Sequence, residues 1–180
     1  MGLHANPDQA GRLLDTITDF IVDWLCLQMD AFTTIDGIFI LDDIVGFLGE
    51  KDFLKFAKPL LKKIFACREV SVRFFHNDAA GLVCAPHLAE IGINLFNFSS
   101  DHGLAKMRKL CGESVALLGN IPPRDVLASG TTAQVKEAAE SMLNGLNDRK
   151  RIIASCGGGM PPDVSTENIN AFIAAVENHR

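Results

Sequence analysis

The sequence contains no tyrosine and only one tryptophan among its 180 residues, and its Lys and Arg residues (17) are outnumbered by Asp and Glu (22). A formal net charge of −5 without a basic run argues against nucleic-acid binding, which requires clustered Lys and Arg beside the phosphates. The longest mostly apolar stretch, Ile35 to Leu48, is interrupted by three Asp residues. We therefore expect no segment to span a membrane.

The N-terminal residues Met1 to Asn6 lack the apolar core of a signal peptide, which favours a cytoplasmic protein. The five cysteines show no CxxC spacing, and in the cytoplasm they would stay reduced. No linker, repeat or low-complexity segment divides the chain, so residues 1–180 are expected to form a single domain. A complete eight-stranded β/α barrel needs roughly 250 residues, so this length can hold only part of one.

Short apolar runs alternate with longer amphipathic stretches along the whole chain. The short runs predict strands at Gly37–Leu41, Val70–Phe75, Leu95–Phe98, Val115–Leu118 and Arg151–Ala154. The amphipathic stretches predict helices at Gln9–Asp30, Lys51–Ala66, Ala79–Ile91, Leu104–Leu110, Thr132–Leu146 and Glu167–Asn178. This alternation predicts an α/β fold with about five parallel strands in one sheet and the helices outside it.

Polar or glycine-rich residues follow every predicted strand. They are Asp42-Asp43, His76-Asn77-Asp78, Ser99-Ser100-Asp101-His102, Gly119-Asn120 and Ser155-Cys156-Gly157-Gly158-Gly159. In a parallel β/α fold these positions converge on one face, where active sites are built. The sequence therefore predicts a site at the carboxyl ends of the strands.

Each candidate also has a purely structural interpretation. Asp42 and Asp43 could cap the helix that follows them, with one carboxylate turned to the site. His76 could be a hydrogen-bonded structural residue, although its position beside Asn77 and Asp78 favours a catalytic or metal-binding role. A carboxylate at Asp78 would be stabilised by a helix N-terminus in any case.

The glycine run and Cys156 are equally open. Gly157–Gly159 could present backbone N–H groups to an anion, or could only turn the chain. Cys156 could be a metal ligand, a nucleophile or a small residue at the end of a strand.

Four segments resemble the uroporphyrinogen decarboxylase superfamily, in the same order along the chain. They are GIFILDDIVG (Gly37–Gly46), FFHNDAAG (Phe74–Gly81), VALLGNIPPRDVLASGT (Val115–Thr131) and CGGGMPPDVSTENINAFIAAV (Cys156–Val176). The resemblance implies a partial (β/α)₈ barrel, corresponding to its fourth to eighth strands, with the N-terminal half absent. It also implies one of two activities: decarboxylation of a tetrapyrrole without a cofactor, or corrinoid-dependent methyl transfer.

Departures from the family pattern favour the methyltransferase branch. The decarboxylases carry a His where this chain has Gly158, and they use a pocket Tyr, which this sequence lacks. The thiol-directed methyltransferases bind zinc through a His-x-Cys motif and a later Cys. His76 matches that His, whereas Asp78 stands in place of the Cys and Cys156 lies near the last ligand.

The resemblance thus implies zinc held by His76, Asp78 and Cys156, since carboxylate oxygen is an ordinary zinc ligand. The alternative is a metal-free acid–base pair of His76 and Asp78 that delivers a proton to a leaving group. A methylated corrinoid is the other implied cofactor. The expected catalytic residues are His76, Asp78, Asp42 and Asp43, and the expected cofactor-binding residues are Asn120, Ser99, Gly157, Gly158 and Gly159.

We accordingly predict a corrinoid-dependent methyltransferase whose partner is a corrinoid protein or a tetrapyrrole-type ligand. A uroporphyrinogen decarboxylase-type enzyme and a non-catalytic, truncated barrel module are the alternatives. Half a barrel leaves two sheet edges unpaired and one face uncovered. Three explanations stay open: a fragment of a longer product, a separate N-terminal half-barrel, or a homo-oligomer. The uncovered face is expected to expose Ile38, Phe39, Phe74, Phe96, Leu117 and Ile153.

Overall fold

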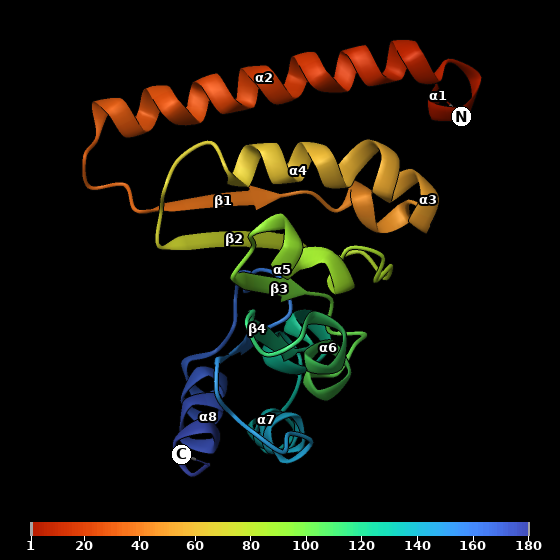
Figure 1. Cartoon of the computed structure of the whole chain (residues 1–180). Coiled ribbons are helices and arrows are strands. Elements are labelled where there is room, and N and C mark those ends of the chain that lie inside the picture. Colours follow the sequence, from red (N-terminus) through yellow and green to blue (C-terminus); the bar gives the residue numbers. More distant parts are fainter. Residues whose placement is uncertain (1, 180) are drawn as a thin grey trace.

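The computed structural model describes residues 2–179 and contains one five-stranded sheet (Figure 1). Its strands lie in chain order and are all parallel. They are β1 (Gly37–Leu41), β2 (Val72–Asn77), β3 (Leu95–Phe98), β4 (Ala116–Ile121) and β5 (Ile152–Cys156). The predicted α/β fold with the architecture of a partial (β/α)₈ barrel is confirmed.

The helices connect the strands and, in Figure 1, α2 and α8 lie at opposite ends of the molecule. The α-helices are α1 (Gly2–Ala5), α2 (Pro7–Ala31), α3 (Glu50–Asp52), α4 (Lys58–Phe65), α5 (Leu88–Ile91), α6 (Leu104–Cys111), α7 (Thr132–Asn144) and α8 (Thr166–Glu177). The remaining elements are two short 3₁₀ helices, η1 (Ile44–Phe47) and η3 (Ala85–His87), and two short π-helical segments, η2 (Phe53–Ala57) and η4 (Pro123–Ala128). No helix among the described residues is long and apolar enough to cross a membrane.

One predicted helix, Ala79–Ile91, is largely wrong. Residues 78–84 form a loop, and helical structure starts only at Ala85. Asp78 therefore precedes a loop and does not lie at a helix N-terminus. Gly81 lies within this segment, and Pro86 lies in the first turn of η3, where its missing backbone N–H is tolerated.

The helix-covered face of the sheet carries the main core. Phe75, Phe96 and Leu117 lie side by side in register on β2, β3 and β4, and all three are fully buried. They pack in one cluster with helical residues such as Phe65 and Met107. The expectation that Phe96, Leu117 and Ile38 would be exposed is wrong, because side chains alternate between the faces of a strand.

The opposite face of the sheet is only partly covered. Phe39 of β1 is 55% exposed and stacks on Phe74 of β2, with 4.5 Å between the ring centroids. Leu41 and Ile153 are also exposed. Exposure of Phe39 and Ile153 was expected and is confirmed, whereas Phe74 is half-buried.

Helix α2 carries a second uncovered apolar surface. Alternate steps of four and three residues place five large side chains on one stripe of this helix, and all five are exposed: Leu13, Ile17, Phe20, Trp24 and Leu27. Another side of α2 is fixed to the rest of the chain by ion pairs from Asp19 to Lys63 and from Asp30 to Arg68.

Candidate functional site

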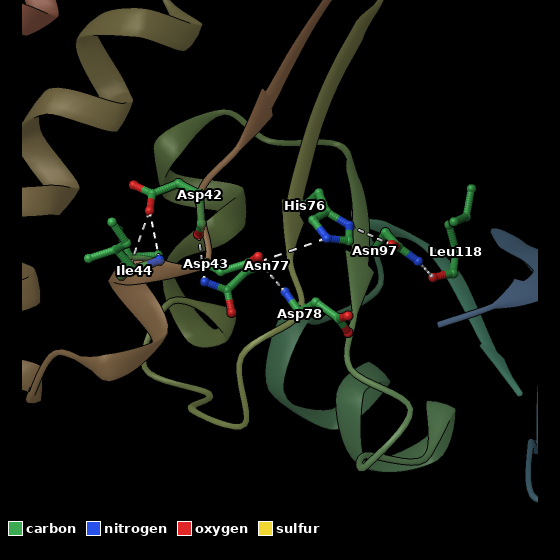
Figure 2. Close-up of polar contacts among 9 residues, drawn as sticks. Asp42, Asp43, Ile44, His76, Asn77, Asp78, Asn97 and Leu118 are labelled. Atoms are coloured by element: carbon green, nitrogen blue, oxygen red, sulfur yellow. Dashed lines mark hydrogen bonds and ion pairs between the residues drawn. The ribbon is translucent and has the colours of Figure 1, made fainter. Parts of the chain in front are cut away.

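His76 lies in strand β2 and points to the partly covered face of the sheet. It pairs in register with Asn97 of β3, and its Nδ1 lies 2.6 Å from Asn97 Oδ1. Asn97 Nδ2 donates to the backbone oxygen of Leu118 on β4, at 2.7 Å. A chain of contacts across three strands therefore fixes the imidazole, whose side chain remains 12% exposed (Figure 2).

The Asp43 carboxylate lies beside this imidazole, and Asp78 is joined to Asp43 through its backbone. Asp43 Oδ1 is 3.8 Å from His76 Nε2 and accepts a hydrogen bond from the backbone N–H of Asp78, at 2.7 Å (Figure 2). The Asp43 contact joins the segment after β1 to the segment after β2. The structure thus brings three of the four predicted catalytic residues together at the carboxyl ends of adjacent strands.

The electrostatics of this group favour proton exchange. Burial raises the pKa of Asp78, while the neighbouring His76 charge lowers it and the carboxylates of Asp43 and Asp101 raise it further. A carboxyl group with a raised pKa beside an imidazole is a typical acid–base pair. An imidazole with a carboxylate oxygen 3.8 Å from its Nε2 can accept a proton from a bound group.

Asp42 is the fourth predicted catalytic residue, and its surroundings differ from those of Asp43, His76 and Asp78. Its Oδ1 accepts hydrogen bonds from the backbone N–H groups of Ile44 (2.9 Å) and Val45 (3.3 Å), at the start of η1. Its side chain borders an apolar cavity of about 360 Å³ between α2 and α4. These contacts match the capping interpretation, and Asp42 contributes its backbone oxygen to the site by accepting from Asn77 Nδ2 at 2.8 Å.

Replacing Asp42 with Asn should make the protein more stable at neutral pH. Burial raises the Asp42 pKa above its ordinary value of 3.8, so the native state holds the proton more tightly than the unfolded state. Stability conferred by this group is therefore greatest below pH 3.8 and falls as pH rises to the native pKa. Asn stays neutral and keeps the capping oxygen, so its advantage should grow above about pH 4.

Urea unfolding at several pH values between 4 and 7 measures this effect, where those limits span roughly the titration range of carboxyl groups. Asp125→Asn, at an exposed carboxylate, is the control. If the free energy of unfolding of Asp42→Asn changes with pH in parallel with that of the wild type over this range, the prediction is wrong.

Cys156 lies in a small apolar core. It is the last residue of β5 and packs with Ile121, Leu127 and Val135 in a small core under α7 and α8. Burial raises the pKa of its thiol, which disfavours the thiolate that binds metals. Within residues 2–179, no three His, Cys, Asp or Glu side chains are grouped so as to hold a metal ion. His76, Asp78 and Cys156 therefore do not form the expected zinc-binding set in this structure.

Several predicted cofactor-binding residues have structural contacts of their own. Asn120 is buried and its Nδ2 donates to the backbone oxygens of Ser99 (3.3 Å) and His102. The Ser99 hydroxyl accepts from the Asp101 N–H. These bonds tie the end of β4 to the loop after β3 and leave the Asn120 amide nitrogen engaged.

The first two glycines of the run Gly157–Gly159 also have structural roles. A Cβ on Gly157 would lie 2.9 Å from the backbone nitrogen of Ser100, so the glycine permits close packing of two loops. Gly158 has a φ of +66°, and a Cβ there would meet Asp78 Oδ2 at 2.9 Å. Gly159 has nothing within 4 Å. The run therefore brings the end of β5 up to Asp78.

Sequence reasoning missed Asn97 as a member of the site. It lies inside the predicted strand Leu95–Phe98, whereas the candidate residues all follow the predicted strands. One signal was present: a polar residue within a short apolar strand is expected to have a hydrogen-bonding purpose when buried. Its partner could not be known without the strand register.

Comparisons with known proteins identify the family and the fold. The family described as Uroporphyrinogen decarboxylase (URO-D) matches residues 1–179. The uroporphyrinogen decarboxylase of Chloroherpeton thalassium is 28% identical over 179 residues, which are 95% of this chain and 49% of the relative. That of Ovis aries is 29% identical over 191 aligned positions, covering 98% of this chain and 49% of the relative.

A solved methyltransferase from Methanosarcina mazei has a TM-score of 0.80 and 21% sequence identity, over 97% of this chain and 50% of the other. At this identity the likeness concerns the fold. The family match spans nearly the full sequence, and this chain belongs to the uroporphyrinogen decarboxylase family. It spans about half the length of the curated relatives it matches.

Proposed function

We propose that this chain provides the acid–base half of a corrinoid-dependent methyltransferase of the uroporphyrinogen decarboxylase family. The observation that carries the proposal is His76, held by Asn97, with Asp43 Oδ1 3.8 Å from its Nε2 and Asp78 bonded through its backbone to Asp43. The name of the M. mazei structure, a methyltransferase, agrees with it. We take the methyl donor to be a methylated corrinoid presented by a partner protein, and the acceptor to be a thiol.

The residues of this chain would handle the proton of the acceptor. A thiol must lose its proton before it is a good nucleophile, and a nearby base at the right distance accelerates that loss. As the sulfur–methyl bond forms, the cobalt–carbon bond of the donor breaks and its electron pair stays on cobalt. The thiol proton passes to Nε2 of His76, where the nearby Asp43 carboxylate stabilises the imidazolium.

Zinc would supply a further means of acidifying the thiol. In this structure the expected ligands do not form a three-residue set, so the proposal uses the metal-free alternative and derives no step from zinc. Zinc binding at His76, Asp78 and Cys156 stays a prediction for metal analysis of the purified protein. The proposed use of free thiols fits a reducing compartment such as the cytoplasm.

The test is methyl transfer from free methylcobalamin to 2-mercaptoethanol, followed by the corrinoid spectrum and by mass spectrometry of the thioether. We expect the wild-type chain to form the thioether, and His76→Ala to lower the rate by about 10²-fold or more, as for loss of a general base. His179→Ala, near the C-terminus and bonded to Ala175, is the matched control and should be unchanged.

The outcomes separate the competing functions. If the wild type forms no thioether, or if His76→Ala and His179→Ala behave alike, the proposal is wrong. Carbon dioxide release from uroporphyrinogen would instead support the decarboxylase alternative, which the names of the curated relatives favour. If neither thioether formation nor carbon dioxide release is detected, the result would support a non-catalytic module.

A further inference from the structure

The two nitrogens of His76 have different surroundings, and the neighbours of Asn97 explain why. The backbone oxygen of Leu118 can only accept a hydrogen bond, so the Asn97 atom that lies 2.7 Å from it must be the NH₂ group. The amide oxygen of Asn97 is then the atom that faces His76 Nδ1, at 2.6 Å. The orientation of the amide is thus fixed from outside the site, by strand β4.

An amide oxygen carries no proton, so a hydrogen bond to it requires a proton on the imidazole nitrogen. His76 Nδ1 is therefore the donor. A neutral imidazole has only one N–H, which leaves Nε2 with a free lone pair. The nearest carboxylate oxygen, Asp43 Oδ1, lies 3.8 Å from Nε2, which is too far for a hydrogen bond.

We infer that Asn97 is a positioning residue that holds His76 as the Nδ1–H tautomer and so selects Nε2 as the nitrogen that exchanges protons at the site. The hydrogen bond from Asn97 Nδ2 to Leu118 O fixes the orientation of the amide, so that its oxygen points to the His76 ring. The role of the tautomer in catalysis rests on the proposed function. The tautomer itself rests only on the contacts among β2, β3 and β4.

Burial of Asn97 restricts its amide to one orientation. Asn97 is 2% exposed, so neither end of its amide can turn to solvent without leaving a buried group unsatisfied. Such a loss is unfavourable, because the buried group gives up its hydration without gaining a partner. Reversing the amide would set its carbonyl against the carbonyl of Leu118 and lose that hydrogen bond, even if the NH₂ group then donated to an unprotonated Nδ1.

The experiment is long-range ¹H–¹⁵N NMR of the full chain labelled with ¹⁵N-histidine, at a pH where the ring is neutral. We expect His76 Nδ1 to show the shift of a protonated nitrogen and Nε2 that of an unprotonated one. Asn97→Asp should keep this pattern because a carboxylate also accepts from Nδ1–H. Asn97→Leu should lose it and give a mixture of tautomers.

Asn94→Leu is the matched control. Asn94 also joins β2 and β3 by its amide, accepting from Arg73 N and donating to Ser71 O, both at 2.8 Å, away from His76. We expect it to lower stability as Asn97→Leu does but to leave the His76 tautomer unchanged. In the methyl-transfer assay, Asn97→Leu should be slower by about 10²-fold and Asn97→Asp should recover much of the loss.

A wild-type spectrum with the proton on Nε2 would overturn the inference without any variant. So would a folded Asn97→Leu protein that keeps the Nδ1–H pattern. If the Nδ1–H tautomer is found but no thioether forms in the wild type, the proposed function fails and the assignment of Asn97 stands.

Discussion

Gly81→Ala should destabilise the protein by about 3 kcal/mol or more, at or beyond the upper end for overpacking a tight contact. A Cβ at Gly81 would lie 1.7 Å from the backbone oxygen of Gly46, so one of the two loops must move. These loops follow β2 and β1 and carry Asp78 and Asp43 respectively. We therefore expect the substitution to separate the two carboxylates and to lower methyl transfer together with stability.

Gly11→Ala provides a control of opposite sign. Gly11 lies within α2, and a Cβ there meets nothing within 4 Å, so Ala should stabilise the helix by about 0.5–1 kcal/mol. Both variants can be compared by equilibrium urea unfolding. A Gly81→Ala protein within about 0.5 kcal/mol of the wild type, the usual range of surface changes, would show that the loops do not touch in solution.

Phe75→Ala should cost about 3–5 kcal/mol, the range for deleting a buried aromatic side chain. Phe75 is 0% exposed, stacks on Phe96 with centroids 6.0 Å apart, and meets Phe65 edge-on at 6.3 Å. Natural domains are stable by only about 5–15 kcal/mol, so this single change would remove a large share of that stability. The free energy of unfolding from urea titration measures it.

Phe20→Ala tests whether the loss of stability depends on burial of the side chain or only on its being Phe. Phe20 lies on the uncovered stripe of α2 and is 69% exposed. Phe20→Ala should change stability by no more than about 0.5 kcal/mol in the isolated chain. Equal losses for Phe75→Ala and Phe20→Ala would mean that the stripe is covered in solution, and light scattering would then show whether by a second copy.

The strands were predictable because each is a short apolar run bounded by turn residues. β1 and β3 have the predicted bounds, and the other three begin one or two residues later and end two or three residues later. The helix starts at Thr131 and Ser165 depend on equally local chemistry, since each side chain accepts from the backbone N–H three residues on. Local chemistry suffices for features of this kind.

The predicted helix Ala79–Ile91 failed because residue types alone do not reveal tight packing between loops. Gly46 and Gly81 each look like an ordinary turn glycine, and only the fold shows that one presses on the other. The exposure expected for Phe96 and Leu117 failed for another reason. Adjacent residues of a strand face opposite sides, and the helix-covered side can be assigned only when strand register is known.

For the site, the sequence placed Asp43, His76 and Asp78 at the ends of neighbouring parallel strands, since the order of elements determines where strand ends converge. Tertiary structure alone decided which way each side chain turns: Asp42 to the cap of η1, Cys156 into the core beneath α7 and α8, and His76 toward Asn97. Convergence follows from chain order, whereas the direction of a side chain depends on register and on partners that lie far away in the sequence.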